Sequence, residues 1–468
     1  MKIKRVFIKE YKNLKDFEIN FSSDNYISVI IGKNGSGKSN FLEALTLIFK
    51  YLYLDTEKTP FLDFEIEYKC SDNNIKIEGF STLNKKRQGY EIIVNNSPIS
   101  FSNFKNDINS KGMKYLPENI ILYYSGLVKR LENTAKRFEE DFKRSINNSA
   151  KGIHDNLSIK QRPIFYVKPE HTQFMFLSLI SSDLESLNNF KYERLNLTQL
   201  KKIAIYFKKP SWAKPKGTIE NFWGASNGAV LQLLEILRDN SKIKRAIDGE
   251  LYFLIESDIL NKLKKIKDLL GYEKDLFFKF EEAYLNDIIT RVSLGFKNPN
   301  NDFLIWSDNF SEGEQQFITL KSLTEFIGTN DTLFLFDEPD TYLHPEWQRE
   351  FIPELEKSER TTQFIITTHS PQILQHQKKE DVFLIEKGEI KETSPTYGRD
   401  NNSALFALGI NARREDIQLQ INNLFSLLED ENKEKALELY EKLVDILGED
   451  DPDMISAKIE IDFIDELD

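Results

Sequence analysis

Hydrophobic and polar positions alternate at the start of the chain. Residues 3–8 and 16–21 show a period of two and predict two strands flanking a short loop. Residues 26–31 form a short, apolar, β-branched run, which is typical of a strand buried on both faces. From Ser39 onward the apolar positions are spaced as on one face of a helix, which we predict through Leu52. The opening pattern is therefore strand, glycine-rich loop, helix.

The pattern changes several times after this helix. Residues 61–100 alternate and predict antiparallel strands, and residues 116–126 predict a buried strand ending in a loop. A helical face begins at Leu127, and most of residues 175–290 also reads as helices. Further strands are predicted at residues 302–306, 332–336, 364–367 and 382–386, and the tail after residue 401 reads as helical. The whole pattern predicts an α/β fold with a mixed β-sheet core, flanking helices, a mainly helical insertion and C-terminal helices.

Composition restricts the class of protein further. The chain has 468 residues, enough for two or three domains, and it contains no uninterrupted apolar run that would span a membrane. The first residues lead into a strand rather than a signal peptide, so we expect a cytoplasmic protein. Its one cysteine, Cys70, excludes an internal disulfide, and five histidines make a histidine-rich metal cluster unexpected.

The net charge of −12 is concentrated at one end. Residues 429–468 contain 16 Asp or Glu and 4 Lys, which gives −12, so the preceding residues sum to zero. An acidic tail does not prevent a basic surface elsewhere, and nucleic acid therefore remains a possible partner.

The loop after the third predicted strand fits the pattern G-x-x-x-x-G-K-S. Backbone N–H groups of such a loop wrap phosphates, and the start of the following helix favours an anion. Lys38 is expected to reach the β- and γ-phosphates of ATP, and the Ser39 hydroxyl to ligate Mg²⁺. The residues expected around the nucleotide are Gly32, Asn34, Gly35, Ser36, Gly37, Lys38, Ser39 and Asn40.

A pair of acids follows the apolar strand predicted at 332–336. Asp337 is expected to hold Mg²⁺ through water, and Glu338 to orient or deprotonate the attacking water. Such a pair also occurs in solvated turns, so its weight comes from the phosphate-binding loop earlier in the chain.

Two shorter segments complete the set. Ser311, Gly313 and Glu314 lie at a predicted helix start and form a second anion-binding element, although the same residues also read as an ordinary helix cap. His369 follows a strand in T-T-H-S, where it could contact a γ-phosphate.

In this order, the glycine loop, the S-x-G-E signature, the acid pair and the histidine resemble the ABC ATPase head of SMC and RecF proteins. The resemblance implies ATP and Mg²⁺ as cofactors and a homodimer that encloses two nucleotides. In that family the signature of one protomer caps the ATP of the other. It places Asp340 and His344 in a segment of cross-dimer contacts, and makes Gln173 a candidate Mg²⁺ ligand. The expected divisions are residues 1–126 and 301–400 for the two halves of the head, 127–300 for the insertion, and 401–468 for an acidic region that docks a partner.

Three further segments resemble the ATPase subunits of Septu-type and retron-associated antiphage systems. They are LPENIILYYSG, YGRDNNSAL and the acidic helical tail. In those systems a separate HNH nuclease accompanies the ATPase, which implies such a partner here. No nuclease site is visible in this chain, because the segment after Ile385 offers amphipathic helices rather than strand-end acids.

These features lead to an ATPase switch subunit that controls a partner nuclease. The alternative is a stand-alone RecF-like repair ATPase acting as a nucleotide-gated DNA clamp. A transporter subunit is disfavoured by the long insertion. For DNA contact, the best candidate is the loop around Trp212, although a solvated surface is the default for every basic cluster. The basic clusters are Lys85, Lys86 and Arg87; Lys208, Lys209, Lys214 and Lys216; and Lys262, Lys264, Lys265 and Lys267.

Overall fold

The computed structural model divides the chain into two units, Met1–Gly398 and Arg399–Asp468. It describes all residues except 23–24, 55–57, 113, 151–161, 189, 196, 214–217, 220–221, 225–228, 247–249, 299–300, 329–330, 358–361, 399–404, 406–412, 430–431 and 468.

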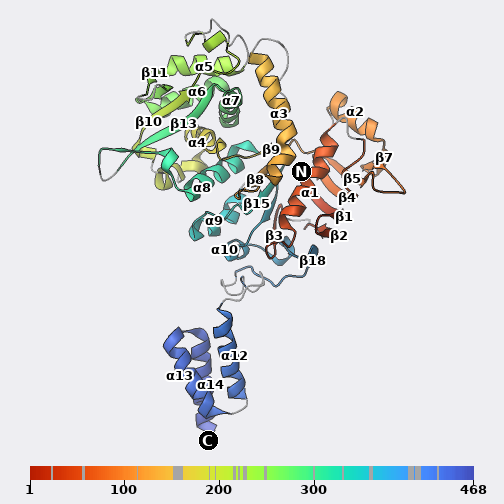
Figure 1. Ribbon diagram of the computed structural model, residues 1–468, viewed down its shortest axis with the longest axis vertical. Helices are drawn as coiled ribbons and strands as arrows, with labels where there is room; N and C mark the ends of the chain where they lie inside the picture. Colours follow the sequence, from red (N-terminus) through yellow and green to blue (C-terminus); the bar gives the residue numbers. More distant parts are fainter. Residues whose placement is uncertain are drawn as a thin grey trace. The chain divides into compact units, whose positions relative to one another are not determined.

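The centre of the first unit is a seven-stranded sheet in the order β18-β17-β3-β16-β15-β8-β9 (Figure 1). Its pairings are parallel except for that of β18 with β17. Every residue of the three central strands is buried, which explains their continuous apolar sequences. The strands are β3 (Ile27–Ile31), β8 (Asn119–Tyr124), β9 (Ile164–Tyr166), β15 (Thr332–Asp337), β16 (Gln363–Thr367), β17 (Val382–Glu386) and β18 (Glu389–Lys391).

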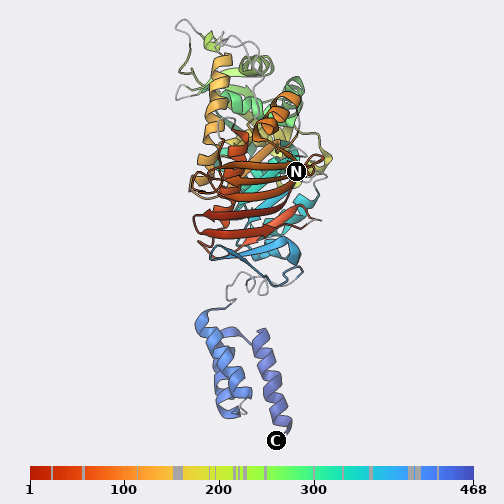
Figure 2. The ribbon, with the colours of Figure 1, turned by 90° about the vertical axis from the view of Figure 1, so that its right-hand side faces the viewer.

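A six-stranded antiparallel sheet, seen from its broad side in Figure 2, has the order β2-β1-β4-β5-β6-β7. Helix α1 (Lys38–Tyr53) shares one hydrophobic core with both sheets, and its Phe41, Leu45 and Phe49 are completely buried. That core fixes the start of α1 beside the end of β3. The strands and the accompanying helix are β1 (Lys2–Tyr11), β2 (Leu14–Asn20), β4 (Phe64–Cys70), β5 (Asn73–Phe80), β6 (Gly89–Val94), β7 (Ser97–Ile99) and α2 (Phe101–Lys111).

The insertion contains a sheet that the sequence pattern did not indicate. Five antiparallel strands in the order β11-β12-β10-β13-β14 pack with four helices. The expectation of helices over most of residues 175–290 is therefore wrong for β10, β11 and β12, and for the start of β13. Runs such as LYFLI in β12 are apolar throughout, and a short apolar run does not distinguish a strand from a buried helix. The strands are β10 (Leu200–Phe207), β11 (Lys242–Arg245), β12 (Leu251–Ile255), β13 (Ile289–Lys297) and β14 (Leu304–Trp306).

The helices of the insertion and of the following segment complete this unit. The longest is α3, which follows β8 after a short loop and has the strong amphipathic pattern expected from residue 127 onward. The helices are α3 (Arg130–Ala150), α4 (His171–Ser181), α5 (Ala229–Asn240), α6 (Ile259–Leu270), α7 (Glu273–Leu285), α8 (Glu312–Ser322), α9 (Pro345–Glu356) and α10 (Pro371–Leu374). Short helical turns lie at Glu185–Leu187, Phe190–Arg194, Leu197–Gln199, Phe222–Gly224, Ser307–Asn309, Leu323–Ile327 and Lys379–Asp381.

The second unit consists of α12 (Glu415–Glu429), α13 (Lys433–Leu447) and α14 (Pro452–Leu467). These helices bury their own core, which includes Leu424, Leu443 and Met454. Among the described residues, no helix is long and apolar enough to cross a membrane.

Candidate functional site

The loop between β3 and α1 has the backbone that the sequence motif requires. Gly32, Gly35 and Gly37 have φ values of 148°, 77° and 126°, in the region that favours glycine. A Cβ on Gly32 would lie 2.2 Å from the carbonyl oxygen of Ile385, so a side chain has no room there. Gly37 precedes α1 without a side-chain cap, which leaves the first N–H groups of this helix to an outside acceptor. The loop can therefore cradle phosphates.

Lys38 connects this loop to the histidine at the end of β16. Its ammonium donates to the carbonyl oxygen of Gly32 at 2.8 Å and lies 2.8 Å from Nε2 of His369. Burial lowers the pKa of Lys38. Burial and the nearby Lys38 charge also lower the pKa of His369, so the neutral imidazole can accept a hydrogen bond from the ammonium. The two side chains, 331 positions apart in sequence, share one site.

Asp337 is the last residue of β15 and is 2% exposed. Burial raises the pKa of its carboxyl group, against hydrogen bonds from the hydroxyls of Thr367 and Ser39 that lower it. Thr367 Oγ1 lies 2.5 Å from Asp337 Oδ1. A buried carboxylate with hydroxyl partners is suited to Mg²⁺, which prefers oxygen ligands.

Glu338 has an unusual backbone, with φ at 52°. Its N–H donates to the carbonyl oxygen and to Oγ1 of Thr367 at 3.1 and 3.0 Å. Its own carbonyl accepts from Ser125 Oγ at 2.7 Å. Glu338 Oε1 lies 3.7 Å from Nε2 of His369, so both side chains face the same space. Neighbouring hydrogen bonds thus hold a strained residue in place.

Asn13, in the turn between β1 and β2, supports the phosphate-binding loop from a separate sheet. Its Nδ2 donates to the carbonyl oxygens of Gly35 and Ser36 at 3.0 and 2.9 Å. Its Oδ1 accepts from Asn40 Nδ2 at 2.6 Å. Asn40 in turn accepts from Arg130 Nη1 at 2.9 Å. Asn13, Ser125, Arg130 and Thr367 have no role that could be predicted from sequence, because their partners lie far away along the chain.

The signature segment forms a capped helix start. Ser311 Oγ accepts from the N–H of Glu314 at 3.3 Å, and Glu314 Oε2 accepts from the N–H of Ser311 at 2.9 Å. A Cβ on Gly313 would lie 2.6 Å from the carbonyl oxygen of Tyr342, so glycine permits a close approach there. The exposed Ser311 is available to another molecule.

Asp340 and His344 belong to the turn between β15 and α9. Asp340 Oδ2 accepts from Thr368 Oγ1 at 2.9 Å, and burial raises the pKa of this carboxyl to about 6. His344 caps α9, because its Nδ1 accepts from the N–H of Glu346 at 3.4 Å. Thr368, which donates this hydrogen bond, directly precedes His369, so Asp340 is linked to the segment that carries the histidine.

Gln173 is engaged elsewhere. Its side-chain oxygen accepts a hydrogen bond from the N–H of Val292, in the insertion sheet. This contact ties α4 to β13 and occupies one of the two lone pairs of that oxygen. A role for Gln173 as a metal ligand stays a prediction.

The loop expected to contact DNA is also anchored. Trp212 Nε1 donates to the carbonyl oxygen of Asn286 at 2.9 Å, and Lys208 pairs with Asp287 at 2.8 Å. Lys214 and Lys216 lie outside the described residues. In α6, Lys264 and Lys267 pair with Asp183 at 3.0 and 3.2 Å. These lysines have acidic partners within the insertion, and contact of this loop with DNA stays a prediction.

A glycine-cradled helix start, a buried lysine, and a strand-end Asp-Glu pair define a P-loop ATPase with an α/β fold. The chain belongs to the AAA ATPase domain family, whose profile matches residues 1–374. It is 24% identical to the Retron Ec83 probable ATPase of Escherichia coli over 99% of this chain and 87% of that protein. It is 22% identical to the Retron Vc95 probable ATPase of Vibrio cholerae serotype O1 biovar El Tor, over 92% and 82%. A shorter match, 29% identical over 24% of this chain and 31% of the relative, is to the Septu protein PtuA of Bacillus thuringiensis.

Among solved structures, the chain is similar to an SMC head bound to the C-terminal winged-helix domain of ScpA, with a TM-score of 0.37 and 12% identity over 84% of this chain and 97% of that one. It is also similar to RecF bound to an ATP analogue, with a TM-score of 0.33 and 14% identity over 84% and 98%.

Proposed function

We propose that the chain is the ATP-binding and ATP-hydrolysing switch subunit of a bacterial antiphage defence complex. The observation that carries this proposal is the single cluster formed by Lys38, Asp337, Glu338 and His369 around the glycine loop. The similarity to the Retron Ec83 probable ATPase extends over 99% of the chain, which supports a related biological role.

The residues of the site divide the chemistry among them. The loop N–H groups and Lys38 would bind the phosphates of ATP, and Lys38 would exchange its present acceptors for phosphate oxygens. Ser39 and Asp337 would hold Mg²⁺, since the Ser39 hydroxyl already hydrogen-bonds the Asp337 carboxyl. When bound, this ion supplies positive charge that stabilises the transferring phosphoryl group.

In this proposal Glu338 orients and deprotonates the attacking water. Its side chain leaves the end of β15 beside His369, and the hydrogen bonds that its backbone N–H donates to Thr367 fix the direction of that departure. The neutral imidazole of His369 can donate an N–H to a γ-phosphate oxygen without carrying a full charge of its own. Thr367 is thus a positioning residue for both acids.

A second copy of the chain would complete the site. Ser311 and the N–H groups at the start of α8 make hydrogen bonds within their own turn and leave an exposed helix start. In a head-to-tail pair this helix start would cap the γ-phosphate of the ATP held by the partner, as the resemblance to SMC and RecF heads implies. ATP would then control whether two heads stay together.

The test is the substitution Glu338→Gln. It removes the base and keeps the size, so we expect hydrolysis to fall by about 10²–10⁴-fold while ATP binding persists. In the presence of ATP the variant should then accumulate as a dimer. Light scattering with and without nucleotide measures this change. Glu346→Gln, an acid in the first turn of α9, is the matched control and should hydrolyse ATP normally. A Glu338→Gln variant with undiminished hydrolysis would refute the site.

The partner is proposed to be a separate HNH-type nuclease that docks on the acidic helices of the second unit. The second unit has its own core, so deletion of residues 399–468 removes the whole unit. A cut inside α12–α14 would instead expose that core. We expect the shortened chain to bind ATP and to lose copurification with a co-expressed HNH-type nuclease. Full copurification would refute docking on this unit. A chain that binds DNA in an ATP-dependent way without any protein partner would instead favour the DNA-clamp alternative.

A further inference from the structure

The insertion sheet has two unlike faces. On one face every central side chain is fully buried, as Ile205 of β10, Phe253 of β12 and Val292 of β13 show. Helices α4, α5, α6 and α7 pack with these strands, and Figure 1 shows them beside the sheet. The opposite face carries alternating residues of the same strands, because successive side chains point to opposite sides.

The pairing register places four residues of that second face in one row across four strands. Lys244 of β11 pairs with Tyr252 of β12, which pairs with Tyr206 of β10, which pairs with Arg291 of β13. The two tyrosine rings are 5.2 Å apart, and the Arg291 guanidinium lies 3.7 Å above the Tyr206 ring. Both tyrosines are partly exposed, Lys244 is exposed, and the Arg291 side chain is 43% exposed. The row is thus two aromatic rings between two cations.

A third aromatic ring lies at the other end of this face. Lys202 of β10 is opposite Gly295 of β13, which is opposite Trp306 of β14. A Cβ on Gly295 would lie 3.2 Å from the Trp306 ring, so the indole covers this glycine. Between the two rows lie small or apolar residues, Ala204 and Ser293 among them, together with the edge lysine Lys242. Ala204 and Ser293 are buried, so the aromatic rings and cations of the two rows stand on either side of a buried strip.

Two of the acids near this face sit at its margins, and the third, Asp308, accepts a hydrogen bond from Ser293 Oγ at 2.6 Å in the middle of the face. Glu250 precedes β12, Glu256 follows it, and Asp308 follows β14. Glu250 pairs with Arg291 at 2.8 Å, Glu256 pairs with Lys242 at 3.1 Å, and Asp308 lies 3.7 Å from Arg291. The strand positions of this face carry five cations and no acid. The five cations are Lys202, Lys242, Lys244, Arg291 and Lys297.

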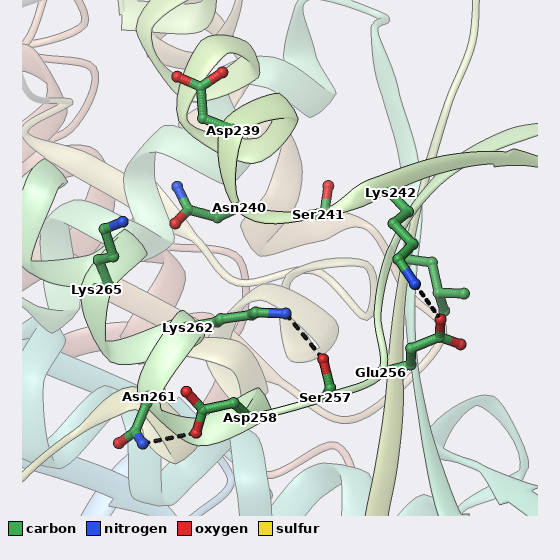
Figure 3. A pocket seen from close by; sticks show the side chains of 11 residues that line it. Asp239, Asn240, Ser241, Lys242, Glu256, Ser257, Asp258, Asn261, Lys262 and Lys265 are labelled. Atoms are coloured by element: carbon green, nitrogen blue, oxygen red, sulfur yellow. Dashed lines mark hydrogen bonds and ion pairs between the residues drawn. The ribbon is translucent and has the colours of Figure 1, made fainter.

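A cavity of about 480 Å³ adjoins the β11 edge (Figure 3). Its lining contains three lysines and three acids, among them the paired Lys242 and Glu256. Since the charges balance, the cavity itself has no preference for an anion. Asp239 and Asp258 balance its lysines Lys262 and Lys265, so the cavity adds no net charge beside the sheet.

We propose that this face of the insertion sheet binds single-stranded nucleic acid. Exposed rings can stack on unpaired bases, whereas the bases of a duplex are already stacked on each other. Lysines and arginine spaced between the rings can neutralise the backbone phosphates that accompany each base. The ATP site plays no part in this binding, so the proposal stands independently of the function proposed above.

The test measures the fluorescence anisotropy of labelled oligo(dT) and oligo(rU) of about 20 nucleotides with the full-length protein. Tyr206→Leu with Tyr252→Leu removes two stacking surfaces and keeps apolar strand residues, so we expect affinity to fall by at least roughly tenfold. Lys242→Gln with Lys244→Gln should lower the slope of log affinity against log salt by about 1.4, for two lost phosphate contacts on a single strand.

Matched controls lie on other surfaces. Tyr397→Leu and the pair Lys85→Gln with Lys86→Gln change exposed residues outside the insertion, and both should bind oligonucleotides as the wild type does. ATP binding should persist in all variants, which shows that they are folded. Preference for either oligo(dT) or oligo(rU) identifies the natural strand and agrees with the proposal. Failure of the wild-type protein to bind either, equal affinity for a duplex, or unchanged binding by the tyrosine variant would overturn it.

Discussion

The seven-stranded sheet and the insertion sheet, both in the first unit, present their polar residues in different ways. The seven-stranded sheet is buried on both faces and presents its chemistry where parallel strands end, at Asp337, Thr367 and the residues after them. The antiparallel insertion sheet presents aromatic and charged residues on one face. Parallel strands gather distant segments at one edge, whereas an antiparallel sheet offers an extended surface. One architecture suits a small reactive group and the other a long ligand.

The largest effect is expected from the support of the insertion. Arg162 Nη2 lies 2.6 Å from Glu281 Oε1, the Glu281 side chain is fully buried, and His171 lies 3.3 Å from the same oxygen. Burial acts to raise the pKa of Glu281, but Arg162 and His171 outweigh it and hold the pKa at about 2. Glu281→Gln leaves Arg162 without a charged partner and should lower the free energy of unfolding by about 3–5 kcal/mol.

Urea unfolding followed by circular dichroism measures this loss. Glu91→Gln breaks an exposed Arg–Glu pair of the six-stranded sheet and should cost less than about 1 kcal/mol. If Glu281→Gln costs no more than Glu91→Gln, the insertion does not depend on its buried ion pair.

A pH-dependent effect is expected in the head. In the folded chain the pKa of Asp340 is about 6, above its unfolded value of about 3.9, so the folded state binds the proton more tightly. Ionisation of Asp340 therefore lowers the free energy of unfolding by on the order of 3 kcal/mol at pH 8, and this loss disappears as pH falls below 4. Asp340→Asn should be more stable than the wild type at pH 8 and equal to it near pH 4.

Thermal unfolding across this pH range checks the difference. The exposed Asp72→Asn serves as the control and should follow the wild-type curve at every pH. A constant difference between Asp340→Asn and the wild type would show that Asp340 does not titrate as described.

Thr367 provides a smaller effect that separates positioning from binding. Thr367→Val removes the hydroxyl that contacts both Asp337 and the Glu338 N–H while keeping the shape. We expect kcat for ATP to fall by about 10–100-fold, since acids that lose their alignment lose part of their catalytic effect. KM should change little, and Thr367→Ser should restore activity. A fall in affinity without a change in kcat would contradict a positioning role.

The smallest effect concerns the anchored loop of the insertion. Trp212→Phe removes the hydrogen bond to Asn286 and should cost about 1 kcal/mol of stability. Oligonucleotide binding should not change, because the row of Tyr206 and Tyr252 carries it in our proposal. A large loss of oligonucleotide binding in Trp212→Phe would show that the loop around Trp212, as first expected from sequence, contacts the oligonucleotide.

The contrast between the sheets also explains what could be predicted from sequence. The strands β3, β15 and β16 are apolar throughout and are followed by distinctive motifs, so their places and the α/β class followed directly. The roles of Lys38, Asp337 and Glu338 stay predictions, although the structure brings all three together. Asn13 and Thr367 could not be found, because an amide or hydroxyl becomes significant only through partners that the fold brings near.

Four of the five strands of the insertion sheet were missed for a related reason. The segment IAIYF of β10 is apolar at nearly every position, since one face meets helices and the other carries tyrosine. Such a sequence lacks the alternation that identifies a strand, and the lysine-rich β11 has too few apolar residues to show any period.

The contact between Lys38 and His369 has a consequence for the proton balance of the protein. While the ammonium stays beside the imidazole, it suppresses protonation of His369. Once Lys38 turns toward a phosphate anion, this suppression is removed and the pKa of the imidazole should rise. Nucleotide binding near pH 6 should then take up protons from solution. Calorimetry in two buffers of different ionisation enthalpy would register that uptake as a difference in apparent heat, and a His369→Gln variant should show a smaller one.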